Sequence, residues 1–405
     1  MHFVNSLKIR GSYGELGNDQ VYYNNVLQEY QFLSSYGFGN YSIDNSAFKT
    51  LYEPVVPNPN FTWEVAKNTD IGIDGTLFNN HIDFTFDYFY NKRDQILWRK
   101  LGSTPQSSGI ANLLPPTNIG KSENKGYDFT VGYNGNVKDF RFSVTVNGGY
   151  ARNKILFQDE PPGAPSWQLA TGHPYGGGGG GAFLPYLYDG VFKDQAEIDK
   201  NTVDYSGLTP ELKPGDMKFK DIGGRDANGN YVKKPDGKID GDDRVRLDKT
   251  QDPTFTGGIN ITMGYKDFDL SILFQGATGG LLYIGTESGD IGNYLKYAYD
   301  NQWTIDKPSS VDPRIANRGN TYYTGNNTYF LRSSDYFRLK NVELGYNMPL
   351  KWTDKISIHS FRVYVSGLNL ATWDKMKIWD PESTSGDAHY YPQARIINVG
   401  ARVIF

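Results

Sequence analysis

Acidic side chains and glycines gather in one stretch of the chain. Asp226 opens this stretch, and Asp236, Asp240 and Asp243 close it, with residues 230–235 inserted between the two halves. Carboxylate oxygens around a tight glycine turn suit a hard cation, so Asp236, Asp240 and Asp243 are the candidate calcium ligands. A solvated acidic turn without a metal explains the same residues. The sequence leaves both interpretations open.

Nothing else in the sequence indicates catalysis or a second metal centre. The chain has no cysteine, which excludes thiolate metal sites, disulfides and thiol nucleophiles. The five histidines are scattered without the spacing of metal ligands. They are His2, His81, His173, His359 and His389. The sequence therefore predicts that this protein is not an enzyme.

The composition combines many aromatic residues with an overall polar character. Aromatic side chains make up 15% of the 405 residues, yet the mean hydropathy is negative. This combination is typical of a protein with a thin apolar outer surface around a polar, water-filled interior. The chain has 41 basic and 45 acidic residues without a basic block, so it lacks the electrostatic footprint of a nucleic-acid-binding protein.

Apolar and polar residues alternate along many segments, which predicts β-strands with one wet face. Clear examples are 82–90, where Ile82, Phe84 and Phe86 alternate with acidic residues and threonine, and 140–146. The segment 259–274 alternates on both sides of Lys266-Asp267, which predicts a hairpin with a very short turn. The phase of the alternation changes near Asn341, where we expect a β-bulge.

Roughly twelve strands are predicted, and several are longer than strands of soluble sheets. Tight connections, such as Asn79-Asn80, alternate with very long ones. No apolar run approaches the ~18 residues of a membrane helix, so a membrane-spanning form must be a closed β-barrel. Short turns on one side and long loops on the other are typical of outer-membrane barrels. The long loops are expected at 21–59, 101–117, 156–253 and 276–327.

The chain ends in a strand rather than in a polar tail. Alternate residues from Ile397 to Phe405 are apolar, and Asn398, Gly400 and Arg402 lie between them. A strand that runs to a final aromatic residue indicates that the terminus is itself structural. Barrels that are sealed by their last strand end in this way.

Several segments together resemble the C-terminal half of the SusC/RagA family, the TonB-dependent outer-membrane transporters of the Bacteroidetes. Their order and spacing span nearly the whole chain. The matching segments are Ser6-Leu7-Lys8-Ile9-Arg10-Gly11, Trp63-Glu64-Val65-Ala66-Lys67-Asn68-Thr69-Asp70, Glu123-Asn124-Lys125-Gly126-Tyr127-Asp128, Tyr188-Asp189-Gly190-Val191-Phe192, Tyr336-Phe337-Arg338-Leu339-Lys340-Asn341-Val342-Glu343-Leu344-Gly345-Tyr346 and Ser366-Gly367-Leu368-Asn369-Leu370.

This resemblance implies an all-β fold, an antiparallel transmembrane β-barrel in the outer membrane of a Gram-negative bacterium. Residues 1–405 would form the C-terminal part of a large plugged barrel with long extracellular loops. Plugged transporters of this size have about twenty-two strands, so the N-terminal plug domain and the first strands are expected to be absent from this chain. The resemblance also implies a SusD-like surface lipoprotein as partner and energy from the TonB complex, through the missing plug. It further implies that Phe405 is the signal for insertion into the outer membrane.

Two functions remain open from the sequence. The first is TonB-dependent import of a nutrient, either a glycan or a peptide, in which this chain supplies barrel wall and loops in contact with outer-membrane lipid. The alternative is a surface β-protein that does not transport, such as an adhesion or carbohydrate-binding module. Rows of apolar residues such as Ile82 to Tyr90 argue against the alternative, because they would be exposed patches in water.

Overall fold

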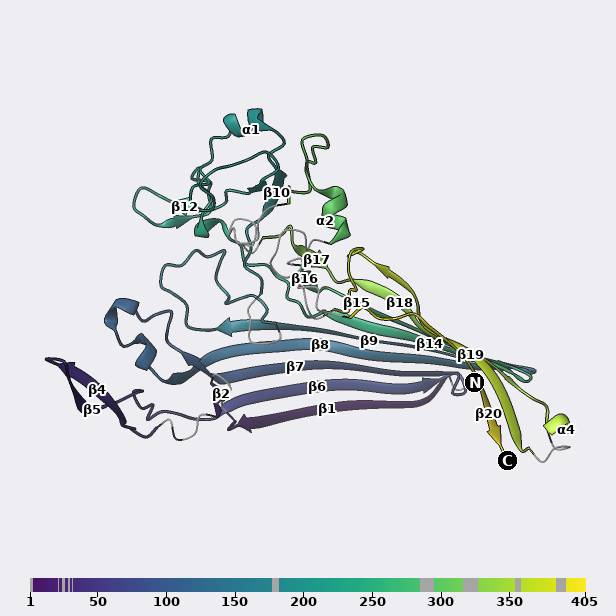
Figure 1. Ribbon diagram of the computed structural model, residues 1–405. Helices are drawn as coiled ribbons and strands as arrows, with labels where there is room; N and C mark the ends of the chain where they lie inside the picture. The colour runs from purple at the N-terminus through teal and green to yellow at the C-terminus, as the bar shows by residue number, and fades with distance from the viewer. Residues whose placement is uncertain are drawn as a thin grey trace.

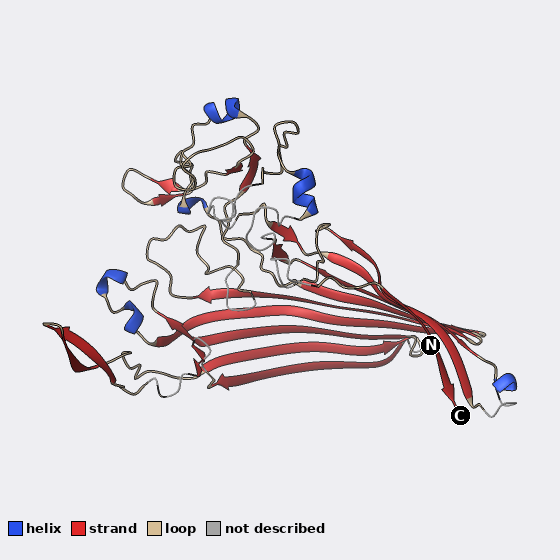
Figure 2. Cartoon of the chain, in the orientation of Figure 1, coloured by secondary structure: helices blue, strands red, loops and turns tan. Residues whose placement is uncertain are grey.

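Ten antiparallel strands form one long curved sheet, which we call the wall (Figures 1 and 2). The computed structural model describes residues 3–20, 22–23, 26–27, 30, 32–176, 182–284, 295–315, 327–353, 358–383 and 391–405. Each wall strand pairs with the next one along the chain. The wall strands are β1 (Val4–Asn18), β6 (Glu64–Leu77), β7 (Ile82–Arg99), β8 (Pro116–Val137), β9 (Phe140–Phe157), β14 (Phe255–Tyr265), β15 (Phe268–Thr278), β18 (Tyr336–Asn347), β19 (Ser360–Asp374) and β20 (Ile396–Ile404).

The wall is an open sheet in the part of the chain described. Here β1 pairs with β6 alone, and β20 pairs with β19 alone. Ten strands are fewer than the roughly twelve expected, because several short strand segments pair with one another in the loops and not in the wall. The all-β antiparallel fold is confirmed, and the open edges are those of a partial barrel.

Connections at the two ends of the wall differ sharply in length. At one end, two- to four-residue turns join β6 to β7, β8 to β9 and β14 to β15, and a twelve-residue connection joins β18 to β19. Asn79, Asn80, Lys138 and Lys266 adopt positive φ in these turns, as tight hairpins require. At the other end, long segments join β1 to β6, β7 to β8, β9 to β14, β15 to β18 and β19 to β20. The predicted asymmetry is confirmed.

The strand register places apolar residues on one face of the wall and polar residues on the other. On β9, the apolar face begins at Phe140 near the short turns and ends at Tyr150 near the loops. A row of outward aromatics marks each limit: Phe140, Tyr265, Phe268 and Tyr346 at the turn end, and Tyr88, Tyr127, Tyr150 and Phe255 at the loop end. Ten residues of strand rise about 33 Å, and a tilt of about 40° reduces this to about 25 Å. That is the height of the apolar band of an outer-membrane barrel.

The predicted bulge in β18 is present. The register shifts between Leu339 and Asn341 against β19 and between Leu273 and Phe274 against β15. Lys340 is the extra residue, so Leu339 and Val342 both face the apolar side. The change of phase in the sequence therefore keeps apolar side chains on the same face of the wall before and after the bulge.

Arginines on the polar face join strands that are not neighbours. Arg10 of β1 bonds Asp74 of β6 at 2.7 Å and reaches Asp87 of β7 at 2.9 Å. It crosses Gly72, where a Cβ atom would lie 2.1 Å from the Asp87 carboxylate. Arg362 crosses Gly345 in the same way to reach Asp269 of β15. These glycines are needed because the ion pairs occupy the space of a side chain.

The segment after β19 folds back onto the polar face. Arg338 of β18 bonds Asp380 at 2.8 Å and Glu382 at 2.5 Å. The side chains of Arg338 and Asp380 are only 3% and 8% exposed. Burial alone would raise the pKa of Asp380. The N–H groups of Gln393 and Glu382 and the Arg338 guanidinium outweigh this effect and lower the pKa below 3.8.

Above the loop end of the wall lies a second folded unit, the loop module. It comprises residues 182–250 together with 295–315 and 327–334 (Figure 1). Its core consists of Phe192, Tyr205, Met217, Phe219 and Ile239, which are almost fully buried. Its elements are β10 (Tyr188–Val191), α1 (Gln195–Asp199), β11 (Met217–Phe219), β12 (Gly224–Arg225), β13 (Tyr231–Val232), η4 (Gly241–Asp243), α2 (Lys296–Asn301) and β17 (Leu331–Ser333), which pairs with β16 (Leu281–Tyr283).

The remaining loops carry small elements of their own. These are β2 (Tyr22–Tyr23), β3 (Val26–Leu27), β4 (Gly37–Ile43), β5 (Ser46–Tyr52), η1 (Gln106–Ser108), η2 (Ala111–Leu113) and, at the turn end, α4 (Leu350–Thr353). Among the described residues, no helix combines the length and the apolar character needed to cross a membrane.

Candidate functional site

Four asparagines lie side by side on the polar face, one on each of β6, β7, β8 and β9. The register pairs Asn68 with Asn91, Asn91 with Asn124, and Asn124 with Asn153. Adjacent strands lie about 4.8 Å apart, so the four amides form one continuous row. We call it the asparagine row. It lies beyond the loop-end aromatics and therefore outside the apolar band.

Sequence reasoning missed this row, although a signal for it exists. On each strand, the last outward-facing residue of the apolar band marks its loop end. The asparagine lies three residues from it, further towards the loops. The pairs are Asn68 with Ile71, Asn91 with Tyr88, Asn124 with Tyr127, and Asn153 with Tyr150. An offset of three reverses the face of a strand, so the asparagines point inward. The signal becomes readable only once the strand register is known.

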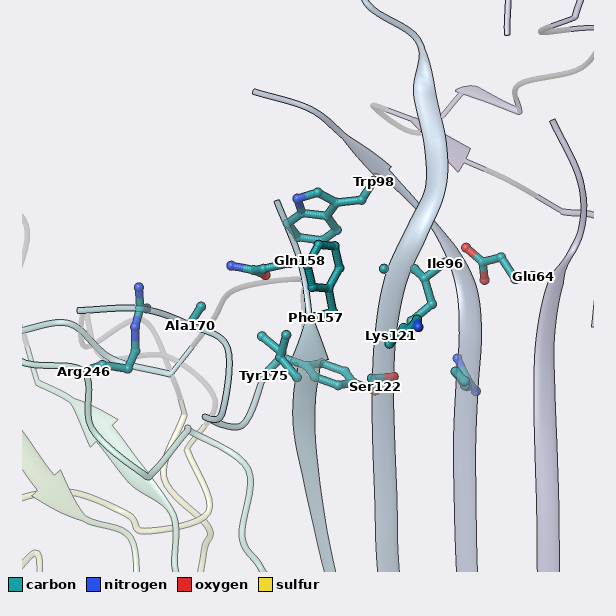
Figure 3. A pocket seen from close by; sticks show the side chains of 13 residues that line it. Glu64, Ile96, Trp98, Lys121, Ser122, Phe157, Gln158, Ala170, Tyr175 and Arg246 are labelled. Carbon is teal, nitrogen blue, oxygen red and sulfur yellow. The ribbon is translucent and has the colours of Figure 1, made fainter. Parts of the chain in front are cut away.

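A cavity of about 390 Å³ adjoins the asparagine row on the loop side (Figure 3). Arg93, Ser122 and Ile155 lie one step beyond the row on β7, β8 and β9, and all three line the cavity. Trp98, Phe157 and Tyr175 supply aromatic surface, while Ala170 and Arg246 come from the segment that leads into and out of the loop module. We call this space the mouth cavity. Its size is that of a small-ligand pocket.

Positive charge exceeds negative charge around the mouth cavity. Arg93, Lys121 and Arg246 line it, against Glu64 as the acidic lining residue. Glu64 already accepts hydrogen bonds from the Leu97 N–H at 3.2 Å and from the Asn18 amide at 3.4 Å. Burial lowers the pKa of Arg246, whose guanidinium donates to two backbone carbonyls. The cavity therefore favours an anionic group.

The acidic stretch predicted as a calcium loop forms a network of turns. Asp243 is fully buried, and its carboxylate accepts the N–H groups of Ile222 at 2.7 Å, Gly223 at 3.2 Å and Asp240 at 2.9 Å. Asp240 caps η4 by accepting the Asp242 N–H, and Asp236 accepts the Lys238 N–H. Burial raises the pKa of Asp243 above 3.8, because these N–H groups offset only part of the desolvation.

In the structure, the carboxylates of Asp236, Asp240 and Asp243 accept hydrogen bonds from backbone N–H groups. Within the described residues, no group of three or more acidic or histidine side chains is placed to hold a metal ion. Calcium binding stays a prediction, to be tested by calorimetry of the purified protein. Heat of binding at millimolar calcium would support it, and its absence would reject it.

Phe405 follows the last residue of β20, at the free edge of the wall. Its side chain is 82% exposed, and β20 pairs with β19 so that Val399 and Val403 lie opposite Val365 and Phe361. The alternation predicted for the terminal strand is therefore present. The role of Phe405 in membrane insertion stays a prediction.

The long strands, the apolar band between two aromatic rows and the polar inner face define a wall of a membrane β-barrel. The family model described as "TonB dependent receptor-like, beta-barrel" matches residues 2–370. The chain belongs to this family.

Two curated relatives come from Formosa agariphila. TonB-dependent receptor P3 is 30% identical over 391 residues, which cover 94% of this chain and 36% of that protein. TonB-dependent receptor P26 is 28% identical over 98% of this chain and 40% of that protein. The chain therefore spans about two fifths of the length of the relatives it matches.

Solved structures of the RagAB peptide transporter share the fold. One is 22% identical with a TM-score of 0.68, and it is covered over 41% of its length by the whole of this chain. The RagAB peptide importer in its 'open-open' state is 22% identical with a TM-score of 0.69, at the same coverage. This likeness shows the architecture of the wall and its loops.

Proposed function

We propose that this chain supplies barrel wall and extracellular loops to a receptor that imports a nutrient across the outer membrane of a Gram-negative bacterium. The observation that carries the proposal is the apolar band of about 25 Å, bounded by aromatic rows, with a folded loop module at one end. In this proposal the rest of the receptor supplies the plug and the remaining strands. Energy comes from the TonB complex acting on the plug.

The proposal includes a SusD-like surface lipoprotein that covers the mouth of the barrel. The loop module exposes three large apolar side chains on its 295–315 segment. Tyr299, Ile305 and Val311 are 69%, 84% and 60% exposed. Apolar residues exposed at the loop end, away from the lipid band, offer a contact surface for such a partner.

Uptake by the native bacterium tests the proposal. Deleting the gene that encodes this sequence should abolish uptake of one class of nutrient, supplied either as peptides or as oligosaccharides. A proton uncoupler should do the same in the wild type, because TonB-dependent import is energised. The protein should fractionate with outer membranes and migrate on gels in a heat-modifiable way.

A surface protein that does not transport would behave differently. It would be monodisperse without detergent and bind oligosaccharides, and its deletion would leave uptake of both nutrient classes unchanged. That set of results would reject the import proposal.

A further inference from the structure

Basic side chains gather on the outer face of the wall, beyond the loop-end aromatics of four neighbouring strands, β6 to β9 (Figure 1). We call this group the basic belt, and it consists of Lys67, Lys92, Lys125, Arg152 and Lys154. Each of these residues lies two or four positions from the last outward-facing residue of the apolar band on its strand. An even offset keeps a residue on the same face, so the basic belt faces outward.

The basic belt lies at the height of lipid headgroups. Two residues of strand rise about 6.6 Å, and a tilt of about 40° reduces this to about 5 Å. Four residues therefore rise about 10 Å above the apolar band. The headgroup layer on each side of a bilayer is about 5–7 Å thick. Lys125 and Arg152 thus lie within this layer, and the other three cations lie at its outer margin.

Two pairs of cations in the basic belt stand directly opposite each other on neighbouring strands. The register pairs Lys67 with Lys92 and Lys125 with Arg152. The Cβ atoms of such partners are about 4.5–5.5 Å apart, and like charges in this position destabilise a sheet. An anion bound between the two cations would make each pair favourable.

The carboxylates near the basic belt do not form hydrogen bonds with these four cations. The closest approaches are Glu15 to Lys67 at 3.8 Å, Asp94 to Lys92 at 3.7 Å, Glu123 to Lys125 at 3.7 Å and Asp248 to Arg152 at 3.5 Å. Charge-assisted hydrogen bonds are about 2.7–2.9 Å long, and on the inner face Arg10 reaches a carboxylate at 2.7 Å. Glu15 and Glu123 instead accept the hydroxyl groups of Tyr13 and Tyr90.

The cations of the basic belt are accessible to a ligand. The side chains of Lys67, Lys92, Lys125 and Arg152 are between 39% and 55% exposed. Lys92 and Lys154 both stand opposite Glu123 in the register, so two cations share that one carboxylate. Exposed ion pairs at such distances contribute little to stability. The basic belt therefore offers accessible positive charge to an anionic ligand.

We propose that the basic belt binds the phosphate groups of a lipid in the outer leaflet. This inference rests on the place in the outer membrane that the import proposal gives to the wall. One phosphate lies between Lys125 and Arg152, and a second lies between Lys67 and Lys92. A phosphate monoester fits because it carries a charge of about −1.5 to −2 and three acceptor oxygens, enough to serve two cations.

The surface below the cations favours a lipid over free phosphate. The rings of Tyr127 and Tyr150 lie next to Lys125 and Arg152 on the side of the apolar band, with their centroids 5.6 Å apart. Acyl chains that descend from a phosphate bound to Lys125 and Arg152 would lie against these rings and the apolar band. Free phosphate would gain nothing from this surface.

The test uses the receptor purified in detergent from outer membranes of its own bacterium and washed free of native lipid. The probes are diphosphoryl lipid A, the same lipid after chemical removal of its phosphates, and inorganic phosphate. Native mass spectrometry counts the bound molecules. The wild type should bind diphosphoryl lipid A about tenfold more tightly than the dephosphorylated lipid.

Variants test the two cation pairs separately. Lys125→Gln/Arg152→Gln and Lys67→Gln/Lys92→Gln should each weaken the binding of diphosphoryl lipid A about tenfold. The matched control Lys138→Gln/Lys266→Gln removes two cations from turns at the other end of the wall and should bind as the wild type does. Heat-modifiable migration checks that each variant folds, and the comparison of the two lipids needs no variant.

Three results would overturn the inference. They are equal binding of the two lipids by the wild type, equal binding of diphosphoryl lipid A by the wild type and both belt variants, and displacement of this lipid by an equimolar amount of inorganic phosphate. The last result would make free phosphate the ligand. All three would leave the import proposal standing. That proposal fails separately, if nutrient uptake is unchanged after deletion of the gene.

Discussion

Apolar side chains avoid water in both the wall and the loop module. The module buries them in its core, whereas the wall turns them outward. Met217 and Ile239 of the module are 0% and 1% exposed, whereas Phe86 and Val131 of the wall are 41% and 43% exposed. The module folds against water and must cover its core with its own chain. The wall faces lipid, so its outward residues need no cover from the protein. Exposure of a large apolar residue therefore has a different meaning in each region.

Truncating a buried side chain should give the largest difference between the two regions in the stability that is lost. Met217→Ala should destabilise the loop module by about 2–5 kcal/mol, because it leaves a cavity in a closed core. Hydrogen exchange should rise across 186–239, while heat-modifiable migration of the barrel is unchanged. Met263→Ala makes the same substitution on the apolar face of β14 and should cost less, because lipid fills the space. Equal effects of the two variants would contradict the comparison.

A charge placed in the wall should distinguish its two faces. Val146 faces outward near the middle of the band, and its neighbour Thr145 faces the polar side. Val146→Arg should destabilise the folded barrel by about 2–4 kcal/mol, the cost of a cation at the bilayer midplane. Thr145→Arg should be tolerated. The measurement is the denaturant midpoint of the refolded receptor in lipid vesicles, and a reversed order would refute the assignment of faces.

The terminal strand should matter for assembly more than for the stability of the finished wall. Phe405→Asp should lower the level of receptor in the outer membrane, because it replaces the final aromatic residue of the sequence with a charge. The conservative variant Phe405→Tyr should restore most of it. Immunoblots of separated membranes measure this effect, and normal levels of the Asp variant would remove the proposed role of Phe405.

Acid should produce the smallest effect, with opposite signs at two buried carboxylates. The pKa of Asp380 is lowered, so the stability that it gives to segment 375–383 is present at neutral pH and is lost as pH falls below about 3.8. The pKa of Asp243 is raised, so the loop module gains stability as pH falls from neutral through that raised value towards 3.8. Both carboxylates accept backbone N–H groups, but Asp380 also contacts Arg338, whereas Asp243 has no cationic partner among the described residues.

Hydrogen exchange at pH 7, 5 and 3 measures both effects in one sample. After correction for the intrinsic pH dependence of amide exchange, protection should rise around Ile222 and Asp243 as pH falls below neutral, and it should fall around Asp380 at pH 3. Asp243→Asn should remove the gain in the module. Changes of the same sign in both segments would show that the carboxylates do not differ as described.

The sequence predicted the wall well because the signal is local. Alternation assigned the faces of the strands from Ile82 and from Phe140, the turn at Lys266-Asp267 marked its hairpin, and the phase change near Asn341 marked the bulge. The loop module was expected only as a long loop. Its core combines Phe192 and Met217 with Tyr329, more than a hundred residues away, and no local period connects them. The calcium ligands were proposed from composition, and the structure assigns those carboxylates to turns.

The sequence alone determined which side of each strand meets an apolar medium, since a period of two fixes this within a few residues. The tertiary structure decided which residues stand level with one another. Asn68 and Asn153 are 85 residues apart, and their places in one row depend on three successive strand registers. The reach of Arg10 to Asp87 depends on the absence of a side chain at Gly72 between them. Such alignments arise from pairing between distant segments, so the local pattern cannot contain them.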